Sequence, residues 1–333
     1  MKHNRNDSTQ NRAAAVCLLA AAGFILALAW DRCSTYWKRS SEPAVIHTLP
    51  LPEYYAQACE RVGTVIRIDY PAKDYTAGTD VVKPAYVYLP YGYDRQKEYD
   101  VLYLIHGWMM QAQDYYADEF GIKTMFDHLI DEGKTKPFIA VSLTFDAENR
   151  PQSYERSVEE LALFHYELRE YALPYLEETL AVYKNSTGRG GYGKTRDHRA
   201  AAGFSMGGVT VWHQFIFNLD LIRSFIPISA DSWINGQQSG LLHTDATVNR
   251  LVSSIRNGGF HADDYFIYAG EGTNDPMFEQ MDAQLNEMKR RQEFSAENTV
   301  IGIKDEGYHD MVLVREQLYN ALPLIFPGTA ENP

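Results

Sequence analysis

The chain has 333 residues, of which 45% are hydrophobic and 23% charged, and its formal net charge at pH 7 is -13. This composition suffices for one large α/β domain or two small ones, and it excludes disorder of the whole chain. The acidic balance, with no basic cluster beyond short pairs such as Arg290 and Arg291, argues against a nucleic-acid partner. A neutral or modestly polar substrate fits better.

The N-terminus resembles an export segment. Lys2, Arg5 and Arg12 precede an apolar run over 13–30, so we expect residues 1–30 to be a signal peptide or an N-terminal membrane anchor. The residues at 27–29 offer an A-x-A-like cleavage site, whereas an apolar run of about 18 residues just suffices to span a bilayer. The extension of the run up to residue 30 favours the anchor. In either case the remainder of the chain is expected outside the cytoplasm, with membrane attachment through 13–30 as one outcome.

Residues 31–60 are polar and contain prolines, which predicts a linker ahead of a catalytic domain over 61–328. The three cysteines, Cys17, Cys33 and Cys59, do not make a disulfide framework, and the sequence leaves open whether Cys33 and Cys59 pair. Neither a C-x-x-C nor an H-E-x-x-H spacing occurs, so we expect no metal and no cofactor.

The hydrophobic pattern changes along the chain. Alternating apolar residues predict strands over 62–70 and 83–90, and the turn residues at 71–79 predict that this pair is antiparallel. From Asp100 on, continuous apolar runs alternate with long amphipathic stretches, which is typical of a parallel sheet covered on both faces. The strands expected there are 101–105, 138–143, 199–204, 225–228, 265–268 and 299–303. The expected helices are 115–131, 157–183, 209–218, 247–256, 277–291 and 311–322. The pattern predicts the α/β-hydrolase fold, with a mostly parallel eight-stranded sheet and helices on both faces.

A G-x-S-x-G stretch, GFSMGG at 203–208, follows one of these strands and opens a helix. The pattern alone is weak because glycine is common, but a strand before it and a helix after it are the context of a nucleophile elbow. In such an elbow the serine lies on a strained turn between small residues. The structural alternative is a glycine-rich turn with a capping serine. Ser205 is therefore the candidate nucleophile.

A second motif, at 188–195, satisfies G-x-x-x-x-G-K-[ST], the pattern of a phosphate-binding loop. A phosphate site needs a strand entering and a helix leaving, so that the N-terminus of the helix faces the anion. Here a predicted helix enters and the strand before Ser205 leaves. We therefore interpret this segment as a surface loop that carries basic residues, not as a nucleotide site.

A serine hydroxyl is a poor nucleophile until a base removes its proton. In α/β-hydrolases the chain order is serine, acid, histidine. His309 lies just past the last predicted strand and before the last predicted helix, where a loop can bring an imidazole over the elbow. His165 and His213 fall within predicted helices, and His198 precedes the nucleophile strand, so we expect structural or surface roles for these three. His309 is the candidate base, with a helix-capping or exposed histidine as the alternative.

The acid is expected in the loop that follows strand 265–268. Asp275 is our choice, although Pro276 after it can start a helix, so that an aspartate that merely caps this helix is the alternative. Asp231, after the preceding strand, is the second candidate and Glu271 the third.

An oxyanion hole needs two preorganised donors, usually the amide after the nucleophile and one from the loop after the third strand. Met206 supplies the first. The second is expected to be the amide of Trp108, or alternatively that of Gly107, in a loop that could also be a simple strand-ending turn.

Several stretches of the chain, taken together, are far more specific than the elbow. They are KPAYVYLPYGY at 83–93, LYLIHG at 102–107, RDHR at 196–199, GFSMGG at 203–208, PISADSW at 227–233 and GYHD at 307–310. Through them the chain from 63 to 326 resembles the feruloyl esterases of carbohydrate esterase family 1, including the esterase modules attached to bacterial xylanases.

The resemblance implies an α/β-hydrolase fold and a triad of Ser205, Asp275 and His309. The chain departs from the family where members often have several glycines after His-Gly, because Trp108, Met109 and Met110 stand there. This departure leaves the shape of the acyl pocket and the feruloyl specificity open, with Met109 as one candidate substrate-binding residue.

Trp233, past the sixth predicted strand, is the other candidate substrate-binding residue. Its side chain is suited to stacking on an aromatic acyl group or a sugar, and packing in the core is the alternative.

The sequence therefore predicts an exported serine carboxylesterase that works through an acyl-enzyme. By resemblance, its partner is an ester-substituted polysaccharide or oligosaccharide, carrying feruloyl or acetyl groups on plant xylan, or a small aromatic ester. An acyltransferase or a hydrolase of another ester on the same fold is the nearest alternative. A catalytically silent carbohydrate-binding domain is the alternative of another class.

Overall fold

The computed structural model describes residues 42–148, 150, 153–183 and 188–329, without the side chains of 188–190. The export segment expected over 1–30 therefore lies outside the described residues, as does Cys33, so its pairing with Cys59 stays a prediction. Within the described ranges, no helix is both long enough and apolar enough to cross a membrane.

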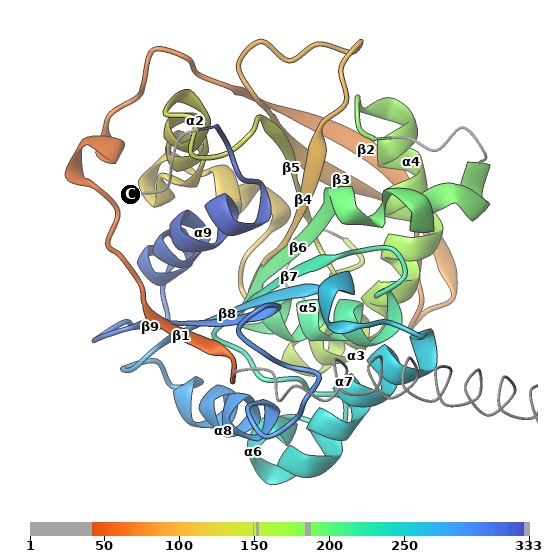
Figure 1. Ribbon diagram of the computed structural model, residues 1–333. Coiled ribbons are helices and arrows are strands. Elements are labelled where there is room, and N and C mark those ends of the chain that lie inside the picture. The colour runs from red at the N-terminus through yellow and green to blue at the C-terminus, as the bar shows by residue number, and fades with distance from the viewer. Residues whose placement is uncertain (1–41, 149, 151–152, 184–187, 330–333) are drawn as a thin grey trace, which may run out of the picture. The chain divides into compact units, whose positions relative to one another are not determined.

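A single nine-stranded sheet organises the described part of the chain, in the order β1-β9-β8-β7-β6-β4-β5-β3-β2 (Figure 1). Its strands are β1 Ala44–His47, β2 Thr64–Asp74, β3 Thr79–Leu89, β4 Asp100–Ile105, β5 Phe138–Leu143, β6 Arg199–Phe204, β7 Ser224–Ile228, β8 Phe266–Gly272 and β9 Thr299–Lys304. Strands β2 and β3 pair antiparallel, as predicted, and β3 pairs antiparallel with β5. All the other pairs are parallel, so the predicted fold class is confirmed.

The sheet differs from the prediction by one strand. The additional strand, β1, pairs with β9 and comes from the stretch 31–60 that the sequence marks as a linker. It has four residues with alternating half-buried and exposed side chains. A run this short, with only Ala44 and Ile46 facing the core, is too brief for its alternation to be recognised.

Helices cover both faces of the sheet. They are α2 Ile122–Asp131, α3 Tyr154–Glu167, α4 Leu173–Thr179, α5 Met206–Phe217, α6 Ser239–Leu242, α7 Thr244–Gly258, α8 Phe278–Met288 and α9 Met311–Ile325. The fully buried strand β4 shows how the core is divided, because successive side chains of a strand point to opposite faces. Val101, Tyr103 and Ile105 share a cluster with residues of α3, α5 and α7, whereas Leu102 and Leu104 share one with residues of α2 and α9. Figure 1 shows α2 and α9 together on one face and α3, α5 and α7 on the other.

Two long predicted helices are interrupted. The segment predicted as 157–183 becomes α3, a π-helical turn over Leu168–Ala172 and α4, which ends at Thr179. Pro174 at the start of α4 has no amide hydrogen to continue the α-helical ladder, which explains the wider turn before it. The segment predicted as 115–131 is α-helical only from Ile122, because Gly121 before it adopts a left-handed conformation with φ of 65°.

Short helical turns complete the connections. They are the 3-10 turns Glu53–Ala56, Ala112–Tyr116, Asp118–Phe120, Gly188–His198 and Ala262–Asp264. The Gly188–His198 turn contains the phosphate-loop-like motif, lies between α4 and β6, and thus has the helix-to-strand context expected from the sequence. Because β4, β6, β7, β8 and β9 are parallel, the loops that follow them meet at one edge of the sheet.

Candidate active site

Ser205 lies between the end of β6 and the start of α5, with φ of 55° and ψ of -122°. Positive φ is strained for a residue with a side chain, and the strain is accepted where it presents a functional group. The Ser205 amide donates to the carbonyl of Ile228 at 3.0 Å, which fixes the turn to β7. The strand, turn and helix predicted around this serine are thus present.

Two glycines make this turn sterically feasible. A Cβ atom on Gly203 would lie 2.2 Å from the carbonyl oxygen of Gly207, and one on Gly207 would lie 2.0 Å from that of Ile105. Neither contact can be relieved by moving a flexible side chain, because both neighbours are backbone atoms. The two glycines of the G-x-S-x-G pattern therefore let α5 start directly against β6 and β4.

Asp275 and His309 form a hydrogen-bonded pair. Nδ1 of His309 lies 2.9 Å from each carboxylate oxygen of Asp275, whose side chain is 1% exposed. A carboxylate only accepts, so Nδ1 carries a proton and donates, and in the neutral form of the ring Nε2 is then the acceptor. The amide of Met277 also donates to Asp275 at 2.7 Å, so the aspartate both caps the following turn and holds the histidine.

The two loops that carry this pair are tied together by their backbones. The amide of Asn274 donates to Gly307 at 2.9 Å, and that of Thr273 donates to Lys304 at 3.1 Å. The His309 ring packs on the ring of Phe204, with centroids 4.4 Å apart, and Phe204 immediately precedes Ser205. The structure thus brings the predicted base and acid to the edge of the sheet where the predicted nucleophile lies.

The other two candidate acids have different surroundings. Asp231 is fully buried and accepts from the indole of Trp233 at 3.0 Å and from the amide of Gly240 at 2.7 Å. Glu271 is 1% exposed, and burial raises its pKa to about 8, which leaves it protonated at neutral pH. Of the three carboxyl groups, only that of Asp275 contacts His309 in the described part of the chain.

The loop after β4 lies directly against the elbow. A Cβ atom on Gly107 would be 3.3 Å from Cβ of Ser205, so a larger residue at this position would press on the serine. The amide of Trp108 donates no hydrogen bond to any of the described residues. Met206, 3% exposed, begins α5, and the first amides of a helix have no partner within the helix. Met206 thus follows Ser205 directly in the chain, and Trp108 follows the glycine that lies against Ser205.

Aromatic side chains border this edge. Trp108 is 38% exposed and meets the ring of Tyr154 edge-on, with centroids 5.3 Å apart. The Tyr154 hydroxyl donates to Gln237 at 3.0 Å, which links the loop after β4, the start of α3 and the loop after β7. The sequence gives no local signal for Tyr154 or Gln237, because neither belongs to a motif. Trp233 is partly buried against the core, and its indole donates to Asp231 at 3.0 Å.

Met109, beside Trp108, is 67% exposed with φ of 68°. The three histidines expected to have structural or surface roles, His165, His198 and His213, have other partners. His198 pairs with Asp100 at the opposite ends of the strands, at 2.7 Å, and His165 stacks on Phe217 at 4.1 Å. Burial lowers the pKa of His213, on α5, to about 4.

A parallel sheet with helices on both faces and a serine elbow beside an Asp–His pair defines the α/β-hydrolase class. The model of the esterase family matches residues 81–324, and the chain belongs to this family. It is therefore a carboxylic ester hydrolase with the serine elbow of its class.

Among curated proteins, the chain is 29% identical over 283 residues to endo-1,4-beta-xylanase Y of Acetivibrio thermocellus. The match covers 83% of this chain and 24% of that protein, so the chain spans about a quarter of the length of this relative.

Two of the similar solved structures illustrate the match. A mutant of the feruloyl esterase module from Clostridium thermocellum, complexed with sinapinate, is 26% identical with a TM-score of 0.75, covering 88% of this chain and 98% of the module. A family 1 ferulic acid esterase from Anaeromyces mucronatus is 21% identical with a TM-score of 0.59, covering 83% and 96%, which supports the fold alone. The resemblance to carbohydrate esterase family 1 feruloyl esterases is thus confirmed.

Proposed function

We propose that the protein is an exported serine esterase that hydrolyses carbohydrate-linked esters through an acyl-enzyme. The observation that carries the proposal is the Asp275–His309 pair, packed on Phe204 beside the strained Ser205. A neutral imidazole held by a buried carboxylate leaves Nε2 free to take the proton of a serine hydroxyl.

In this mechanism, Oγ of Ser205 bonds to the ester carbonyl carbon while its proton passes to Nε2 of His309. The amides of Met206 and Trp108 stabilise the negative charge on the carbonyl oxygen. The ester C–O bond then breaks, and His309 gives the proton to the leaving alcohol. A water molecule attacks the acyl group next, its proton passes to His309, and the carboxylic acid leaves as Ser205 recovers its hydrogen.

The proposed substrate is a feruloyl or acetyl ester on plant xylan. Support comes from the names of the similar proteins, a xylanase and a feruloyl esterase module, and from the aromatic side chains of Trp108, Tyr154 and Trp233 near the elbow. A planar phenolic acyl group packs well against such rings. Met109 is exposed on the same loop and is placed in the substrate site by this proposal.

We further propose that residues 1–30 direct export and that the folded esterase acts outside the cytoplasm. A basic start followed by an apolar run supports this. Fractionation of the source cells and their medium, with detection by an antibody against the folded domain, tests the proposed export. Finding the protein in the cytoplasm would contradict the proposal.

The test of the mechanism compares the full chain with its Ser205→Ala variant on methyl ferulate, acetylated xylan and short-chain nitrophenyl esters. We expect loss of hydrolysis and loss of covalent labelling by a fluorophosphonate in the variant, with unchanged circular dichroism. Ser253→Ala, at a partly exposed position on α7, is the control and keeps both signals. Hydrolysis that survives Ser205→Ala contradicts the mechanism, and activity on nitrophenyl esters alone contradicts the carbohydrate substrate.

A further inference from the structure

His106, the first residue after β4, is completely buried beside the proposed oxyanion hole, and the mechanism above does not use it. Both of its ring nitrogens have partners. Nδ1 lies 2.8 Å from the carbonyl oxygen of Gly107, and Nε2 lies 2.7 Å from the hydroxyl of Thr144. Thr144 follows β5 and is also completely buried.

The direction of each hydrogen bond follows from chemistry. A carbonyl oxygen only accepts, so Nδ1 of His106 carries the proton and donates to Gly107. Burial lowers the pKa of His106 to about 4, so the ring is neutral and Nε2 accepts from Thr144. The Thr144 oxygen itself accepts from the amide of Asp146 at 3.1 Å, which leaves its hydroxyl hydrogen directed at the histidine. With both nitrogens committed, the ring is not available for proton transfer.

The held carbonyl belongs to the peptide that joins Gly107 to Trp108. In a trans peptide the C=O and N–H bonds lie in one plane and point in opposite directions. An anchored Gly107 carbonyl therefore sets the direction of the Trp108 N–H. The amide of Met110 donates to the same carbonyl at 3.2 Å, so the peptide is held by one local backbone donor and one side chain.

We propose that His106 and Thr144 are positioning residues, which hold the Gly107–Trp108 peptide so that the Trp108 amide faces the oxyanion formed at Ser205. This inference rests on the proposed function. The inference adds to the proposed function an explanation of what orients the Trp108 amide. Catalysis by an oxyanion hole requires a donor that is already oriented before the charge develops.

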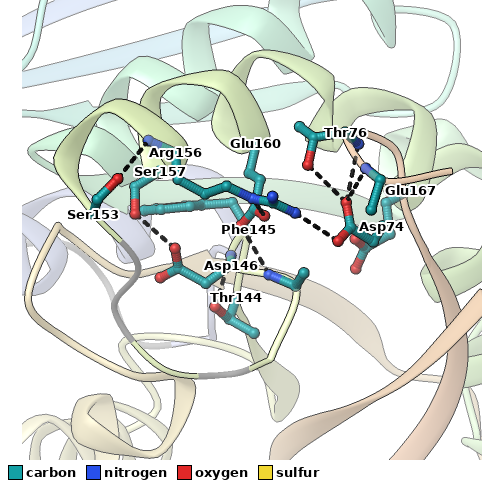
Figure 2. Close-up of polar contacts among 12 residues, drawn as sticks. Asp74, Thr76, Thr144, Phe145, Asp146, Ser153, Arg156, Ser157, Glu160 and Glu167 are labelled. Atoms are coloured by element: carbon teal, nitrogen blue, oxygen red, sulfur yellow. Dashed lines mark hydrogen bonds and ion pairs between the residues drawn. The ribbon is translucent and has the colours of Figure 1, made fainter. Parts of the chain in front are cut away.

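The turn that carries Thr144 is itself anchored to α3. The side chain of Asp146 accepts from Ser157 at 2.7 Å, and the amide of Ala147 donates to Glu160 at 2.9 Å. Figure 2 shows Asp146 and Ser157 turned toward each other beside Thr144. The hydroxyl that meets His106 therefore comes from a fixed backbone.

Charged groups hold α3 in turn. Arg156 contacts Glu160 at 2.6 Å and Asp74 at 2.6 Å, and Figure 2 shows its side chain extended between these two carboxylates. Asp74 ends β2 and accepts from the amides of the following turn at 2.8 and 3.0 Å. The β2–β3 hairpin, α3 and the turn after β5 are thereby joined behind the proposed oxyanion hole.

Two substitutions at His106 separate its two contacts. In His106→Asn the side-chain amide nitrogen occupies the place of Nδ1 and keeps the donor to Gly107, whereas His106→Gln keeps only an acceptor near Nε2. Removing one oxyanion donor outright lowers kcat by roughly 100- to 1,000-fold. We expect kcat of His106→Gln to fall by roughly 10- to 100-fold, since the donor is misdirected and not deleted, and that of His106→Asn to fall by less than about tenfold.

Thr144 provides the second pair of variants. Thr144→Val removes the hydroxyl with little change of shape, and we expect kcat to fall by roughly tenfold with KM changed less than about threefold. Thr144→Ser restores the hydroxyl and is expected to restore kcat. The matched control is the His213→Asn and His213→Gln pair, since His213 is also buried, its pKa is also lowered to about 4, and it contacts neither loop of the site.

The decisive readout compares the binding of two ligands. An arylboronic acid forms a tetrahedral adduct on the serine, whereas ferulate, the acid released by hydrolysis, does not. In His106→Gln and Thr144→Val the boronate affinity should fall in parallel with kcat/KM, while ferulate affinity stays unchanged. Parallel losses of both affinities, or an equal kcat for the His106→Gln and His106→Asn variants, would overturn the positioning role. If Ser205→Ala retains hydrolysis the proposed function fails, whereas normal kcat in His106→Gln with an inactive Ser205→Ala refutes only this inference.

Discussion

Replacing Asp275 by asparagine tests the acid assignment with almost no change of shape. The amide oxygen can still accept from the amide of Met277, which the carboxylate does at 2.7 Å. Its NH2 group, however, meets Nδ1 of His309, which then has to accept. The imidazole is forced into the tautomer with the proton on Nε2, where it cannot act as the base for Ser205.

The size of the effect follows from the distance. A full charge on His309 in the transition state lies 2.9 Å from the carboxylate oxygens, and at an effective dielectric constant of about 20 their attraction is about 6 kcal/mol. Since each 1.36 kcal/mol changes a rate about tenfold, Asp275→Asn should lower kcat about 10,000-fold.

Steady-state hydrolysis of a nitrophenyl ester measures this loss, with thermal unfolding to show that the variant is folded. Glu271→Gln is the matched control, because it changes a carboxyl group on the same strand and loop without contact to His309. We expect it to stay within about threefold of the parent, since it already carries its proton at neutral pH. An Asp275→Asn variant with more than a tenth of the parent kcat, or a larger loss in Glu271→Gln, would refute the reasoning.

Three further outcomes concern stability. Gly207→Ala should abolish folding or activity, because its Cβ lies 2.0 Å from a backbone oxygen, whereas Gly193→Ala, with a nearest contact of 3.4 Å, should express and hydrolyse normally. Lys83→Met leaves Glu167, at 2.7 Å from Nζ, buried without its ion pair and should cost about 3–5 kcal/mol in urea unfolding. A cost below about 1 kcal/mol means that the pair is not balancing a buried charge. Glu271→Gln should gain stability relative to the parent as pH rises from 5 to 8, by at most about 4 kcal/mol, because the native carboxyl group holds its proton up to a pKa of about 8 and the unfolded one up to 4.5. A difference that is flat with pH contradicts this.

Much of the fold could be predicted because the parallel strands are buried on both faces and their apolar runs end at turns. The six residues of β4, for example, are all buried, and the prediction over 101–105 misses only Asp100. The interruptions of the helices could not be predicted from periodicity, since the apolar face continues through the π-helical turn at Leu168–Ala172. Similarly, α6 has only four residues and too short a pattern to be seen.

In the candidate site, too, some residues could be predicted from the sequence and others could not. Ser205 and His309 are marked by local motifs at the ends of strands, and Asp275 by its place in the loop after β8. Thr144 depends on a partner 38 residues away, His106, and no local pattern announces such a contact.

The short strand β1 has a practical consequence for anyone who trims the chain. Its four residues cover the outer edge of β9, pairing Ala44 with Val300 and His47 with Ile303. Starting the protein at residue 61 strips this cover and leaves unpaired amide and carbonyl groups along β9, a template on which other chains can add strands. Such a shortened enzyme should aggregate at concentrations where one starting at residue 42 stays monodisperse. The same cut loosens the strand that leads into the His309 loop, so solubility and turnover should decline together.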